Sequence, residues 1–128
     1  MSDPLQQAVQ LQIAAAAEGF DWPQDSTLNQ QLWAKLYEEI AELQQAPDLA
    51  ARAEELGDLL FMVVNLGRHL HIDPSAALSA ANRKFERRFG YILERAAALP
   101  PLGEPGRLDA MESLWLAAKQ AEKRGELE

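Results

Sequence analysis

The sequence predicts an all-α bundle of four main helices and a short C-terminal helix, in a single domain over residues 1–128. Three observations favour this fold. Apolar residues recur every three or four positions, which places them on one face of an α-helix. Two segments begin with an Asp followed by a Pro, a pair that caps a helix and fits its first turn. No stretch alternates apolar and polar residues between turn signals, as a half-buried strand would.

The first helix is expected to begin at Asp3 and Pro4 and to end at Gly19, a residue type typical of helix ends. The loop GFDWPQD follows it. A second helix is expected to be capped by Ser26 or Thr27 and to end near Gln45, ahead of a proline.

A third helix is expected from its cap, Asp48, to about Leu70. Its apolar side chains surround nearly the whole circumference: they are Leu56, Leu59, Leu60, Phe61, Met62, Val63, Val64 and Leu66. We therefore expect this helix to be central and to be covered on most sides.

A fourth helix is expected from Asp73 and Pro74 to about Leu99, where the segment PPLGEPG breaks it. Asp109, with Glu112 three residues later, resembles a capping box for the short last helix.

Composition restricts the function. The formal charge of −8 disfavours a nucleic-acid surface, because such surfaces neutralise phosphates with Lys and Arg. No apolar run is long enough for a membrane span, and the N-terminus lacks a secretory signal. With no cysteine the chain forms no disulfide, which does not itself identify a compartment. A cytoplasmic location is the default expectation for a chain without a secretory signal.

Two carboxylate pairs stand out. Glu39 and Glu42 on the second helix, and Glu55 and Asp58 on the third, are each three residues apart and therefore share a helix face. Both pairs lie beside apolar positions. If the two helices pack antiparallel through the short connection at Pro47, all four acids converge.

Four carboxylates near a core repel one another strongly unless a cation offsets their charge. Mg²⁺ suits such a cluster, because it prefers carboxylate and water oxygens and leaves positions open for phosphates. Either pair taken alone is also typical of a solvated helix face.

The fourth helix gathers cations in NRKFERRF, residues 82–89, where Arg83 with Arg87 and Lys84 with Arg88 form pairs one turn apart. Such a face suits a polyphosphate, although it is also typical of an ordinary basic surface. On the last helix Trp115 precedes Lys119 by one turn, which fits either nucleotide contact or core packing. Lys35, one turn before Glu39, could reach phosphate or support its own helix.

Taken together, these segments resemble the MazG-type nucleoside triphosphate pyrophosphohydrolases. The resemblance rests on E38-E39-x-x-E42, E55-L-G-D58 and N82-x-K84-F-E-x-x-R88, and it extends from the GFDWP loop to MESLWLAAK. This chain looks like the C-terminal half of the longer two-domain members.

The resemblance implies a Mg²⁺-dependent enzyme, with Mn²⁺ as a substitute, that splits a nucleoside triphosphate into the monophosphate and pyrophosphate. It implies metal ligands, residues that contact the nucleotide, and catalytic groups drawn from both sets. The ligands are Glu39, Glu42, Glu55 and Asp58. The nucleotide contacts are Lys35, Glu38, Asn82, Lys84, Arg87, Arg88, Trp115 and Lys119. The catalytic groups are Glu38, Glu39 and Lys84.

The resemblance also implies a homodimer or a dimer of dimers. From the net charge and the lack of a long apolar run, we expect no nucleic-acid partner and no membrane partner. The leading function is broad hydrolysis of NTPs and dNTPs that cleans nucleotide pools. The alternatives are a narrower dUTP or dCTP pyrophosphatase, and a non-catalytic nucleotide-binding or interaction module.

Overall fold

The computed structural model describes residues 3–127, which contain five α-helices, one short 3₁₀ helix and no strand. The helices are α1 (Pro4–Ala17), α2 (Leu28–Gln45), α3 (Leu49–His69), α4 (Pro74–Leu93) and α5 (Arg107–Lys123), and the 3₁₀ helix is η1 (Ala96–Ala98). The all-α prediction is confirmed. The chain divides into two compact units, of which the first ends at Ala77 and the second begins at Leu78.

The helix starts of the first unit follow the predicted caps, with one exception. Asp3, Asp48 and Asp73 each accept a hydrogen bond from a backbone N–H in the following first turn. The position predicted for the cap of α2 is right, since Thr27 is the residue before the helix, but its side chain makes no capping hydrogen bond. The N–H and the hydroxyl of Thr27 both donate to Asp25.

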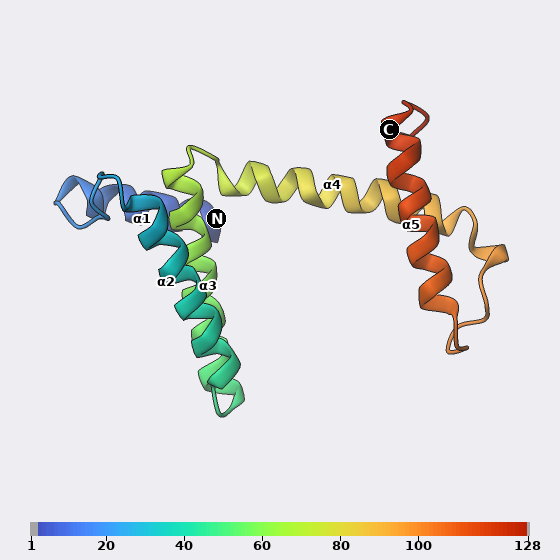
Figure 1. Ribbon diagram of the computed structural model, residues 1–128, viewed down its shortest axis with the longest axis horizontal. Coiled ribbons are helices and arrows are strands. Elements are labelled where there is room, and N and C mark those ends of the chain that lie inside the picture. The colour runs from blue at the N-terminus through green and yellow to red at the C-terminus, as the bar shows by residue number, and fades with distance from the viewer. Residues whose placement is uncertain (1–2, 128) are drawn as a thin grey trace. The chain divides into compact units, whose positions relative to one another are not determined.

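The core of the first unit lies between α2 and α3, which run antiparallel and side by side (Figure 1). Leu32, Met62 and Leu66 are buried there, and Trp22 packs against them from the loop before α2. Helix α1 also packs on α3. Burial of these apolar side chains therefore holds α2 and α3 together.

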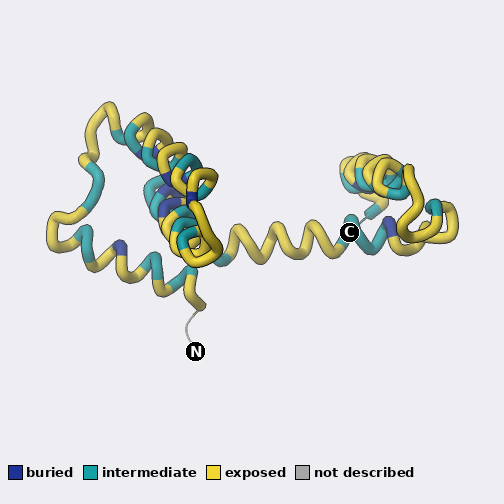
Figure 2. Tube along the Cα trace, turned by 90° about the horizontal axis from the view of Figure 1, so that it is seen from below, coloured by how far each residue is buried: buried dark blue, intermediate teal, exposed yellow. Residues whose placement is uncertain are grey.

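Coverage of α3 is smaller than the sequence predicted. Met62 and Val64 are buried, but Leu56, Leu60 and Val63 are 48%, 50% and 45% exposed. Among the described residues α3 packs on α1 and α2, and these two helices leave the three side chains half exposed. Figure 2 shows this mixture of buried and exposed positions along the helix pair.

The helix ends of the second unit differ from the prediction. Helix α4 stops at Leu93 instead of Leu99, because residues 93–98 are all exposed and offer no buried apolar face that would extend it. Residues Ala96–Ala98 form η1. Helix α5 begins at Arg107 and has 17 residues, so it is not short. Asp109 is not its cap. It lies in the first turn, where its charge suits the helix dipole.

Candidate active site

Three of the four predicted metal ligands form a cluster on the α2 and α3 pair. One carboxylate oxygen from each of Glu39, Glu42 and Glu55 lies within 4.8 Å of the other two. Glu39 is buried, Glu55 is half-buried and Glu42 is exposed. The antiparallel packing brings the acids of the two helices together, as the spacing predicted.

Two oxygens of this cluster have no partner. Oε2 of Glu39 and Oε2 of Glu55 are buried, and neither accepts a hydrogen bond from any residue in the described range. Burying a charged oxygen without a partner is costly. A hard divalent cation would satisfy both oxygens, so the residues present fit a metal.

The environment of Glu42 shows the same crowding of negative charge. Its pKa lies above the ordinary value, first because the carboxyl group loses hydration and next because Glu39 and Glu55 repel its charge. Crowding of this kind favours binding of a cation.

Asp58 is the fourth predicted ligand. It follows Glu55 by three residues on α3 and lines the pocket that Glu39 also lines, but it is exposed and is not one of the three clustered acids. Glu38 is likewise outside the cluster, with 55% of its side chain exposed.

Lys35 neutralises part of the cluster. Its Nζ lies 3.2 Å from a carboxylate oxygen of Glu38 and 3.2 Å from one of Glu39. Its pKa is raised, first by Glu38 and then by Glu39, so the side chain stays charged. Since Lys35 also lines the pocket, its ammonium group lies between the acids and the cavity.

A pocket of about 600 Å³ extends from the acids along α1, the loop before α2, and α3. Its apolar lining is Leu11, Ala15, Phe20, Trp22, Pro23, Phe61 and Met62. Its polar lining is Gln12, Asp21, Gln31, Lys35, Glu39, Asp58, Asn65 and Arg68. A mostly apolar cavity of this size with a few polar groups is typical of a small-molecule site.

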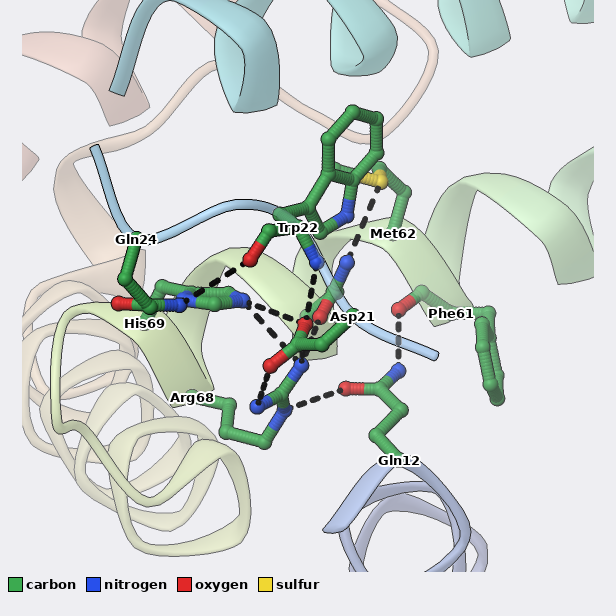
Figure 3. Close-up of polar contacts among 9 residues, drawn as sticks. Gln12, Asp21, Trp22, Gln24, Phe61, Met62, Arg68 and His69 are labelled. Atoms are coloured by element: carbon green, nitrogen blue, oxygen red, sulfur yellow. Dashed lines mark hydrogen bonds and ion pairs between the residues drawn. The ribbon is translucent and has the colours of Figure 1, made fainter. Parts of the chain in front are cut away.

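One wall of the pocket is a hydrogen-bonded network around Arg68, shown in Figure 3. Arg68 binds both oxygens of Asp21, at 3.0 and 2.7 Å. His69 lies 3.0 Å from Asp21 and 3.3 Å from Gln24, so both of its ring nitrogens have a polar partner. The pKa of Asp21 is well below its ordinary value, chiefly because of Arg68. The network fixes the loop before α2 against α3.

Sequence reasoning did not single out Asp21, Arg68 or Gln12 as site residues. Asp21 and Arg68 are 47 positions apart, and their pairing follows from tertiary packing alone. Two signals were available: Gln12 is polar beside the apolar stripe of the first helix, and Asp21 lies in the GFDWP loop that belongs to the family resemblance.

The predicted phosphate contacts of the fourth and last helices lie in the second unit. Arg87 and Arg88 both donate to Glu122 of α5, at 2.6 and 2.8 Å. The guanidinium of Arg88 also lies 5.3 Å from the ring centre of Trp115. Asn82, Lys84 and Lys119 are exposed. Sequence reasoning missed Glu122, which brings the two arginines together.

Comparison with known proteins places this arrangement in a family. The model of the phosphoribosyl-ATP pyrophosphohydrolase family matches residues 5–85. The chain belongs to this family. The matched residues of this family member include all the clustered acids, Asp58, Asn82 and Lys84, and they end before Arg87. The family implies a divalent metal, and the acid cluster provides ligands for one.

The relatives of this family member include bacterial enzymes. The nucleoside triphosphate pyrophosphohydrolase of Escherichia coli (strain K12) is 43% identical over 124 residues, which are 92% of this chain and 45% of the relative. The nucleoside triphosphate pyrophosphohydrolase/pyrophosphatase MazG of Thermotoga maritima is 36% identical over 115 residues, or 90% of this chain and 44% of the relative. The MazG-type resemblance is confirmed. The chain spans less than half the length of these relatives.

Within the described residues, no helix combines the length and the apolar character that a membrane span requires.

Proposed function

We propose that this chain hydrolyses nucleoside triphosphates and deoxynucleoside triphosphates to the monophosphate and pyrophosphate. One observation carries the proposal: a three-carboxylate cluster, with two buried and partnerless oxygens, borders a pocket large enough for a nucleoside. The names of the two relatives above support this reaction.

In this proposal Glu39, Glu42 and Glu55 hold Mg²⁺, and Asp58 contributes from the next turn of α3. The donor set is entirely carboxylate oxygen, which favours Mg²⁺ over softer metals and allows Mn²⁺ as a substitute. When bound, the cation supplies positive charge against the triphosphate and polarises water for the attack on phosphorus.

The side chains around the metal ligands orient the reaction. Lys35 is paired with Glu38 and Glu39 and also lines the pocket. It therefore contacts the phosphates of a nucleotide that extends from the pocket to the acids. Glu38 is exposed, and its carboxylate is paired with Lys35 instead of with the metal ligands. It is therefore the candidate general base that accepts a proton from the attacking water.

The second unit carries the remaining residues that we propose as nucleotide contacts. Lys84 and Arg88 stabilise the negative charge on the departing pyrophosphate, while Asn82 and Arg87 add phosphate contacts. Trp115 and Lys119 close over the nucleotide. The stacking of Arg88 on Trp115 supports a shared role for these two residues.

The assembly is also a proposal. The half-exposed apolar side chains of α3 favour a homodimer or a dimer of dimers, because a second copy would cover them. The single domain and the cytoplasmic location predicted from sequence stay predictions.

The test is incubation of the purified chain with Mg²⁺ and a panel of NTPs, dNTPs and phosphoribosyl-ATP, with release of pyrophosphate measured. We expect release from several NTPs and dNTPs. Release from dUTP or dCTP alone would establish the narrower enzyme. If folded protein released pyrophosphate from none of these nucleotides, the proposed hydrolysis would be wrong. The alternative of a non-catalytic nucleotide-binding or interaction module would then remain.

A further inference from the structure

We infer that Asn65 reads the nucleobase of the substrate as a hydrogen-bond donor. The pocket therefore favours uracil and guanine, whose base-pairing edge carries a carbonyl where cytosine and adenine carry an amino group. The inference rests on the proposed function and specifies its substrate class. Four observations carry it: the bonding of Arg68, the contrast with Gln12, the position of Asn65 on α3, and the lining of the pocket.

The orientation of the Asn65 amide is fixed by Arg68. Nη2 of Arg68 lies 2.7 Å from Oδ1 of Asn65, and a guanidinium can only donate hydrogen bonds. The oxygen of the amide must therefore face Arg68, since the reverse orientation would oppose two donors. Arg68 itself cannot turn away, because Asp21 holds it by two bonds.

The opposite end of this amide is available to a ligand. Among the described residues, the closest partner of Nδ2 is the thioether sulfur of Met62, a weak acceptor at 4.0 Å. Asn65 is half-buried and lines the pocket. The pocket therefore contains an amide N–H pair that lacks a strong acceptor.

Gln12 provides the contrast. Its Oε1 accepts from Nε of Arg68 at 3.4 Å, and its Nε2 donates to the carbonyl oxygen of Phe61 at 3.0 Å. Both ends of its amide are thus engaged by the protein, and Gln12 can only support the pocket wall. Of these two amides, Asn65 alone has an end left for a substrate.

The position of Asn65 suits the far edge of a base. Asn65 follows Asp58 by two turns on the same face of α3, about 10 Å along the helix axis. Both residues line the pocket, with Met62 between them. A nucleotide with its phosphates at the acids and its base along this face would bring the edge opposite the sugar to Asn65.

A donor at this place distinguishes the bases by polarity. A carbonyl accepts the Asn65 N–H, whereas an amino group opposes a donor to a donor and leaves both unpaired. An unmade hydrogen bond in a partly desolvated site lowers affinity by roughly tenfold. We expect the ratio of kcat/KM for UTP over CTP to be of that order.

The experiment compares UTP with CTP, which differ at this edge, for the wild type and two variants. In Asn65→Leu the ratio should fall to near one, and in Asn65→Asp it should invert, because a carboxylate accepts from the cytosine amino group. The matched control, Asn29→Asp, changes an exposed α2 residue outside the pocket and should keep the wild-type ratio. Thermal unfolding of each variant checks its fold.

Calorimetric binding of UMP and CMP without metal separates the two proposals. If the wild type releases no pyrophosphate, the proposed function fails, and a UMP preference that disappears in Asn65→Leu would still support the reading by Asn65. An equal response of the wild type to UTP and CTP, or a preference that persists in Asn65→Leu, would overturn the inference.

Discussion

Glu39 on α2 and Glu55 on α3 approach one another across the helix pair, and each keeps a buried oxygen that no described residue satisfies. Their helices pack through Leu32 and Met62, so the apolar seam holds the two acids together against their mutual repulsion. The cluster is therefore formed before any cation arrives.

The first prediction concerns Glu55→Gln. It removes one charge from the cluster, so without metal the free energy of unfolding should stay equal or rise by a few tenths of a kcal/mol. Mg²⁺ at about a hundredfold its dissociation constant should stabilise the wild type by about 2.7 kcal/mol, and the variant by much less. Thermal unfolding with Mg²⁺ and with EDTA measures both effects. An equal response of variant and wild type to Mg²⁺ would remove Glu55 from the ligand set.

The second prediction concerns Asp58→Asn, because Asp58 lies outside the three clustered acids. Mg²⁺-dependent activity should be lost, while thermal stability without metal should be equal or greater. Glu54→Gln, at an exposed position of α3, is the control and should keep its activity. Unchanged activity of Asp58→Asn would show that the residue is not a ligand.

The third prediction concerns pH and Asp21. Because Arg68 lowers the folded pKa of Asp21 below its ordinary value of 3.8, the pair stabilises the fold above that pH and loses its effect as the pH falls further. Asp21→Asn should cost about 2 kcal/mol at pH 7. The difference from wild type should shrink between about pH 5 and the lowest accessible pH. Urea unfolding across this range measures it, and a constant difference would contradict the pairing.

The fourth prediction concerns Glu122, which accepts from Arg87 and Arg88. Burial alone would raise its pKa, but the two arginines outweigh this and lower it. Glu122→Gln should therefore weaken the attachment of α5 to α4 and expose α5 amides to several-fold faster hydrogen exchange. Glu126→Gln is the control, because Glu126 pairs only with exposed Arg124 among the described residues. Equal exchange in both variants would mean that Glu122 does not hold α5.

The fifth prediction tests the exposed side of α3. Leu60 is half exposed, so Leu60→Glu should leave the single chain folded but should oppose burial against a second copy. Sedimentation should give a dimer or larger assembly for the wild type and a smaller species for the variant. A wild-type monomer at micromolar concentration would contradict the proposed assembly.

The features that the sequence predicted correctly are those that depend on residues close together in the chain. The caps at Asp3 and Asp48, and the meeting of Glu39 and Glu42 with Glu55, follow from helical spacing and a short connection. The capping bond expected from the side chain before α2 does not form, and the Thr27 hydroxyl donates to Asp25 instead.

Other features depend on distant residues and could not be read locally. The pairing of Asp21 with Arg68 requires the loop to fold back on α3, and the engagement of Arg87 and Arg88 by Glu122 requires α5 to pack on α4. Periodicity reveals which face of a helix is apolar, but it does not reveal which polar residue will lie opposite another.

The amide of Gln12 has a consequence for redesign of the chain. It joins a donor on Arg68 to the carbonyl of Phe61, and its side chain is buried. Glutamate would set a negative charge against a carbonyl oxygen, and leucine would leave the guanidinium N–H without its acceptor. The outer positions of α1 are open to exchange for expression, labelling or attachment to a surface, whereas position 12 has to remain glutamine.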